Sequence, residues 1–108
     1  MRALDSASKR GEPLALSAMT LFEIALLSGE GRKRLPVPLP EIFAALGSGT
    51  GFEIVPIDIV VASEVAALGE MLRDPGDRAI VATARVHRLR LVTSDQRIIE
   101  SKLVSVVE

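Results

Sequence analysis

The sequence predicts an α/β fold of three layers, in which helices cover both faces of a mainly parallel sheet. Three observations lead to this prediction. Short apolar runs of the kind found in buried strands alternate along the whole chain with helical segments. The length of 108 residues suits one domain with one core. A hydrophobic fraction of 48% is enough to fill that core, and 25% charged residues is ordinary for a folded protein.

The expected strands are short apolar runs, at residues 14–16, 52–55, 91–93 and 103–107. Apolar and polar residues alternate in the run 52–55, as they do in a half-buried strand. The run 91–93 has the composition of a buried strand. The first ten residues differ, because Leu4 is their one large apolar residue after the initial Met. We expect a weak helix there, which Gly11 and Pro13 stop.

The expected helices have apolar residues at helical spacing or a residue that favours a helix start, at residues 19–27, 40–46, 59–72, 74–88 and 95–102. Apolar pairs recur every three residues in the helix 19–27. Pro40 suits the first turn of the helix 40–46. Asp58 and Asp74 are placed to cap the helices 59–72 and 74–88, and Asp95 begins a short helical turn.

The composition excludes several classes of function. The chain has no Cys and one His, so neither a disulfide framework nor a metal site built from several Cys or His side chains is possible. Its three aromatic residues are all Phe, too few for the base-stacking surfaces of RNA-recognition modules. A net charge of −1 provides no overall basic field for nucleic acid or anionic membrane. A nucleic-acid role therefore requires a local patch.

The localisation is expected to be cytoplasmic, with no membrane partner. The most apolar segment, residues 14–27, contains Glu23 and is shorter than the ~20 residues that cross a bilayer. The first thirteen residues are charged and lack the apolar core of a signal peptide.

Three acidic residues follow strands or begin helices: Glu23, Asp77 and Asp95. In an open parallel sheet, the carboxyl ends of the strands and the amino ends of the following helices share one edge, where ligands bind. The three carboxylates are therefore expected in one metal-sized cluster there. Carboxylates without His or Cys suit a hard cation such as Mg²⁺ or Mn²⁺. The chemistry that follows is metal-assisted hydrolysis of phosphate esters.

Each acid can instead have a purely structural role as a helix cap, and the sequence alone does not decide between the two roles. Thr20 and Glu23 have the spacing of a capping box, and Asp74 can be an N-cap with Asp77 at the third helical position. Asp95 can cap the turn that follows it. We expect His87 to be a surface residue at a helix end. The basic residues 32–34 and Arg85, Arg88 and Arg90 are either solvated or the places that hold phosphates.

Three blocks of sequence resemble a PIN domain, and more narrowly the VapC-type toxins of toxin–antitoxin pairs; they span residues 14–25, 74–84 and 91–95. The resemblance implies a Mg²⁺- or Mn²⁺-dependent endoribonuclease that acts on RNA, forms a homodimer and is inhibited by a cognate antitoxin. It assigns the metal-site carboxylates to Glu23, Asp77 and Asp95. It also makes Asp74 the flanking acid of the Asp-Pro motif and Thr93 the hydroxyl residue before the last acid.

One departure from the family concerns the beginning of the chain. Family members open with a central strand that ends in a metal-binding Asp, whereas here only twenty-two residues precede Glu23. Asp5, in Leu4-Asp5-Ser6, is the candidate stand-in for that acid. We therefore interpret residues 1–108 as a single PIN-like domain that lacks the first central strand and helix.

Two consequences are expected from this departure. Strands 14–16 and 91–93 would each have an unpaired edge, and would pair with one another or with a second chain. With three of four acids, metal binding and RNA cleavage would be impaired. The alternative function is a non-catalytic, toxin-derived interaction module that binds an antitoxin or itself.

Overall fold

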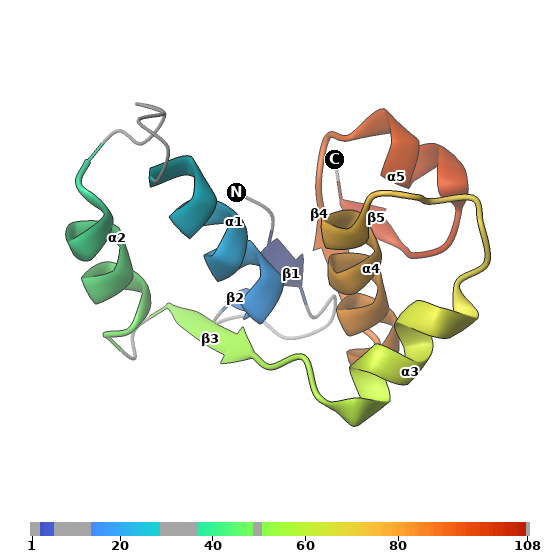
Figure 1. The fold of residues 1–108 in the computed structure, drawn as a ribbon, viewed down its shortest axis with the longest axis horizontal. Coiled ribbons are helices and arrows are strands. Elements are labelled where there is room, and N and C mark those ends of the chain that lie inside the picture. Colours follow the sequence, from blue (N-terminus) through green and yellow to red (C-terminus); the bar gives the residue numbers. More distant parts are fainter. Residues whose placement is uncertain (1–2, 6–13, 29–36, 49–50, 108) are drawn as a thin grey trace.

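The sheet is the centre of the computed structural model, which describes residues 3–5, 14–28, 37–48 and 51–107 (Figure 1). Within these residues its five strands are β1 (Ala3–Asp5), β2 (Leu14–Ser17), β3 (Phe52–Val55), β4 (Arg90–Val92) and β5 (Val106–Val107). They lie in the order β3-β2-β1-β4-β5. The pairs β2–β3 and β4–β5 are parallel, and β1 is antiparallel to both of its neighbours. Four strands therefore run in one direction, which confirms the mainly parallel sheet.

The described helices match the predicted ones closely, and are α1 (Ala18–Ser28), α2 (Leu39–Leu46), α3 (Ile59–Ala67), α4 (Pro75–His87) and α5 (Gln96–Ser101). The largest difference is the end of α3, which was expected to continue to residue 72. Gly69 has a φ of +77°, a left-handed conformation that glycine adopts readily and that cannot continue an α-helix. Among the described residues, no helix is long and apolar enough to cross a bilayer.

Helices cover both faces of the sheet, as the three-layer prediction requires. Ala15 of β2 and Leu91 of β4 are buried with side chains of α3, α4 and α5. The next residue of β2, Leu16, is buried with side chains of α1 and α2, and Val92 of β4 packs against that second cluster. Neighbouring residues of a strand point to opposite faces, so β2 and β4 each contribute to both cores.

The position of β1 corrects the prediction for residues 1–10 and for the centre of the sheet. Residues 3–5 form a strand, not a weak helix; residues 6–10 lie outside the described part of the chain. Leu4 pairs with Ala15 on one side and Leu91 on the other. The edges of β2 and β4 were expected to pair with one another or with a second chain, and β1 lies between them instead. Both edges offer backbone hydrogen bonds, which outweigh the weak strand propensity of Ala-Leu-Asp.

Candidate metal-binding site

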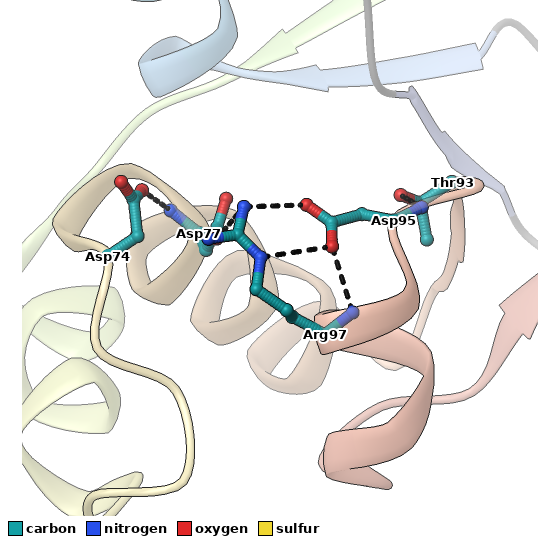
Figure 2. Close-up of polar contacts among 5 residues, drawn as sticks. All are labelled: Asp74, Asp77, Thr93, Asp95 and Arg97. Atoms are coloured by element: carbon teal, nitrogen blue, oxygen red, sulfur yellow. Dashed lines mark hydrogen bonds and ion pairs between the residues drawn. The ribbon is translucent and has the colours of Figure 1, made fainter.

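The carboxyl ends of β2 and β4 lie at one edge of the sheet, because these two strands run in the same direction. Chain segments that leave this edge lead into α1 and α5, and α4 begins beside α1. They contribute four acidic side chains, which we call the acidic edge: Glu23, Asp74, Asp77 and Asp95. Figure 2 shows three of them together with Thr93 and Arg97.

Glu23 lies on α1 and reaches the beginning of α4. The start of α1 is capped by Ser17, whose hydroxyl oxygen accepts a hydrogen bond of 3.1 Å from the Met19 N–H. The capping box expected for Thr20 and Glu23 is therefore wrong. The Glu23 carboxylate instead approaches Gly76, where a Cβ atom would lie 2.5 Å from Glu23 Oε2.

Asp74 and Asp77 belong to the first turn of α4. Asp74 is the N-cap, and its Oδ1 accepts a hydrogen bond of 2.9 Å from the Asp77 N–H, with Pro75 at the helix start. The predicted capping arrangement is confirmed. Asp77 is only 4% exposed, so its carboxylate is buried. A buried carboxylate is costly unless a cation or hydrogen-bond donors compensate its charge.

Asp95 is held between the end of β4 and the start of α5. Its Oδ1 accepts a hydrogen bond of 2.9 Å from the Arg97 N–H, which confirms its predicted role as a helix cap. The buried Thr93 hydroxyl accepts one of 3.1 Å from the Asp95 N–H. Thr93 therefore fixes the backbone that carries Asp95, and it does so without occupying the Asp95 carboxylate.

Arg97 was not expected at this site, and its guanidinium lies between two of the acidic side chains (Figure 2). Its Nε and Nη2 donate hydrogen bonds to Asp95 Oδ1 and Oδ2, at 3.4 and 3.2 Å. Nη2 also lies 3.9 Å from Asp77 Oδ2. The hydrogen bond from the Arg97 side chain lowers the pKa of Asp95, although partial burial opposes the shift. The same hydrogen bond with Asp95 raises the pKa of Arg97.

The acidic edge brings the three predicted carboxylates together less tightly than expected. Glu23 lies against Gly76, the residue before Asp77, and the Arg97 guanidinium links Asp77 to Asp95. Among the described residues, however, no three His, Asp or Glu side chains are close enough together to hold a metal ion. The predicted metal-sized cluster is therefore wrong for this arrangement. Carboxylates repel one another, and here a guanidinium occupies the space between two of them.

The donor set still fits a hard divalent cation. Oxygen atoms of carboxylates are the ligands that Mg²⁺ and Mn²⁺ prefer. Gly76 provides a second indication, because its missing side chain leaves space beside which Glu23 Oε2 and Asp74 Oδ1 both lie. The acidic edge therefore supplies donor atoms of the kind that such a cation takes.

Asp5 does not belong to this edge. Because β1 is antiparallel to β4, Ala3 pairs with Val92, whereas Asp5 pairs with Arg90 at the opposite end of β4. The direction of β1 thus places Asp5 away from Thr93 and Asp95. The interpretation of Asp5 as a stand-in for the first family acid is wrong.

The other polar candidates lie at the far end of α4. A cavity of about 470 Å³ is lined there by Glu64, Arg85, Arg88, Arg90 and neighbouring apolar side chains. Arg85 forms an ion pair of 2.6 Å with Glu64, and His87 is exposed. None of the four acids of the acidic edge lines this cavity. The basic residues 32–34 lie outside the described residues.

Two comparisons with known proteins show the family of this chain. Residues 1–102 match the family model of the PIN domain. Over 97 residues the chain is 35% identical to Ribonuclease VapC22 of Mycobacterium tuberculosis, and the aligned region covers 89% of this chain and 73% of that protein. The range that matches the family model contains the whole acidic edge and Arg97.

Proposed function

This chain belongs to the PIN domain family, and from that premise we propose that it is a VapC-type endoribonuclease that hydrolyses RNA phosphodiester bonds with Mg²⁺ or Mn²⁺. The observation that carries the proposal is the convergence of Glu23, Asp77 and Asp95 on one edge of the sheet. These residues are far apart in the sequence, and separate elements position them. Neither helix capping nor core packing requires all three to meet.

The buried charge of Asp77 supports the assignment of a cation site. Asp77 is 4% exposed, and Arg97 Nη2 lies 3.9 Å from its Oδ2. A buried carboxylate attracts positive charge more strongly than an exposed one, because water screens it less. Asp77 is therefore well placed to attract a divalent cation to the acidic edge.

Each residue has a distinct role in this proposal. Asp77 and Asp95 would bind the cation from the two helix starts, and Glu23 would complete the ligand set from α1. Thr93 is a positioning residue, because its hydroxyl holds the Asp95 backbone. The bound ion would supply an activated water molecule and neutralise charge on the phosphate oxygens.

We also propose the partners and location that accompany this function. They are a cognate antitoxin protein, a second copy of the chain in a homodimer, and the cytoplasm. Exposed apolar side chains support a protein partner, since Phe22 and Leu26 on α1 are 56% and 48% exposed. Both lie on the helix that carries Glu23, so a protein bound there would lie close to the acidic edge.

The decisive experiment measures RNA cleavage by the purified chain in Mg²⁺, in Mn²⁺ and in EDTA, with the Asp95→Asn variant beside the wild type. Asp58→Asn is the matched control, because Asp58 caps α3 in the way that Asp95 caps α5, and Asn preserves capping at both positions. The proposal predicts metal-dependent cleavage that is slow, because one of the four acids expected for the family is missing, and that Asp95→Asn abolishes and Asp58→Asn retains.

Two results would contradict the proposal. Cleavage that persists in EDTA would exclude a metal-dependent reaction. Cleavage that Asp95→Asn leaves unchanged would exclude this site. A chain that binds an antitoxin or itself and cleaves no RNA under any condition would favour the non-catalytic interaction module.

A further inference from the structure

The guanidinium of Arg97 contacts both Asp77 and Asp95, two of the carboxylates that the proposed cation would bind. Its Nε–Nη2 fork faces both oxygens of Asp95, and the same Nη2 faces Asp77 Oδ2 (Figure 2). A cation that binds both carboxylates would lie close to this guanidinium and share acceptor oxygens of Asp95 with it. Two positive groups at that distance repel each other, so each weakens the binding of the other.

Resting on the proposed function, we propose that Arg97 is an internal counter-ion that competes with the divalent cation for Asp77 and Asp95 and thereby weakens metal binding. In the absence of metal, the guanidinium limits the repulsion between the two carboxylates. When metal binds, the Arg97 side chain leaves them.

The exposure of Arg97 makes this exchange feasible. Its side chain is 74% exposed, whereas that of Asp77 is 6% exposed and that of Asp95 26% exposed. Within the described residues, the guanidinium forms hydrogen bonds and ion pairs with Asp95 and an ion pair with Asp77. The hydrogen-bonded pair with Asp95 is solvent-accessible and contributes little stability, and the incoming cation replaces the positive charge that Asp77 loses when the side chain rotates into solvent. The Arg97 backbone N–H holds the Asp95 carboxylate, and the cap from Asp74 fixes the backbone that carries Asp77, whichever way the Arg97 side chain points.

Loss of the guanidinium should affect metal affinity in a defined direction. Replacement of Arg97 by a neutral residue removes one positive charge beside the acidic edge and the two guanidinium hydrogen bonds to Asp95, while the backbone hydrogen bond to Asp95 Oδ1 stays. Both effects favour a divalent cation. Lys keeps the positive charge but cannot form the two-pronged contact with Asp95. An intermediate effect is therefore expected for Lys.

The test is a calorimetric titration of the metal-free full chain with Mn²⁺, supported by the electron paramagnetic resonance signal of free Mn²⁺. We expect Arg97→Gln to tighten Mn²⁺ binding roughly tenfold, and Arg97→Lys to tighten it less. Arg85→Gln is the matched control. Arg85 also forms an ion pair with a carboxylate, that of Glu64, but at the far end of α4, and its removal should leave Mn²⁺ affinity unchanged.

Asp95→Asn separates the two proposals. If Arg97→Gln binds Mn²⁺ no more tightly than the wild type while Asp95→Asn loses binding, the metal site stands and the competition is refuted. If Arg85→Gln tightens binding as much as Arg97→Gln, the effect is one of general charge and the competition is again refuted. If neither the wild type nor Arg97→Gln binds Mn²⁺, the proposed metal site and the competition both fail.

Discussion

Glu23 and Gly76 lie so close together that residue 76 has no space for a side chain unless the carboxylate moves. A Cβ atom on Gly76 would lie 2.5 Å from Glu23 Oε2 and 3.2 Å from Asp74 Oδ1. Gly76 is not among the described residues with positive φ, so the backbone itself does not require glycine. The requirement comes from the close approach of the Glu23 side chain to the first turn of α4.

Gly76→Ala should separate activity from stability. Alanine favours a helix by up to about 1 kcal/mol over glycine, so the free energy of unfolding should stay the same or rise slightly. The new methyl group must displace the Glu23 carboxylate, and Mn²⁺ affinity and RNA cleavage should fall about tenfold or more. Chemical denaturation and Mn²⁺ titration of the same preparation measure both effects.

The control for this prediction is the double variant with Glu23→Gln. If Gly76→Ala acts by moving the Glu23 carboxylate, it should have little further effect on Mn²⁺ affinity once that carboxylate is gone. Equal losses in both backgrounds would show that the methyl group acts on another residue.

The parts of the fold that were predicted correctly depend on local sequence patterns. Apolar runs identify β2 and β4 because these strands are buried on both faces, and Asp58 and Asp74 identify the helix starts that they cap. Strand β1 has no such pattern. It forms because β2 and β4 offer it two edges, and this information is not present in residues 3–5 themselves.

The site was predicted in part for the same reason. Motif spacing located the acidic residues at one edge. It could not give the distances between their carboxylates, because these distances depend on side-chain rotations. Arg97 was missed because an arginine near a helix start is usually solvated. The one available signal was its position two residues after Asp95, from which a long side chain can fold back onto the cap.

Thr93→Val should weaken the site through the Asp95 backbone. The variant keeps the shape of the buried side chain but removes the oxygen that accepts the Asp95 N–H. We expect the free energy of unfolding to fall by about 1 kcal/mol and RNA cleavage to fall several-fold. Thr93→Ser, which restores the acceptor, should recover most of the activity. An equal loss of activity in both variants would contradict a role for the hydroxyl.

Arg78→Met should destabilise the protein without a direct effect on the acidic edge. The Arg78 guanidinium donates hydrogen bonds of 2.6 to 2.7 Å to three backbone carbonyl oxygens near the end of α3, those of Val65, Gly69 and Leu72. Met keeps the aliphatic stem but leaves these carbonyls without the donor. Urea denaturation should show a loss of about 2 kcal/mol. The exposed Arg73, changed to Met, is the control, and an equal loss there would refute the prediction.

The pH dependence of stability should report the ion pair between Arg97 and Asp95. The hydrogen bond from Arg97 lowers the pKa of Asp95 in the folded protein. The pair therefore contributes stability that is present above the unfolded pKa of about 3.9 and is lost as the pH falls through the lower folded pKa. Because the guanidinium is largely exposed, solvent screens the pair and the contribution is small.

The measurement compares urea denaturation of the wild type and Arg97→Gln in EDTA, at several pH values from 6 down to 2. The stability advantage of the wild type over Arg97→Gln should be constant above about pH 5 and should disappear toward pH 2, where Asp95 is protonated in both proteins. Arg85→Gln serves as the reference for the loss of one surface arginine. A difference between wild type and Arg97→Gln that stays the same over the whole range would mean that the guanidinium does not set the pKa of Asp95. A difference that grows as the pH falls would have the wrong sign for a carboxylate whose folded pKa is lowered.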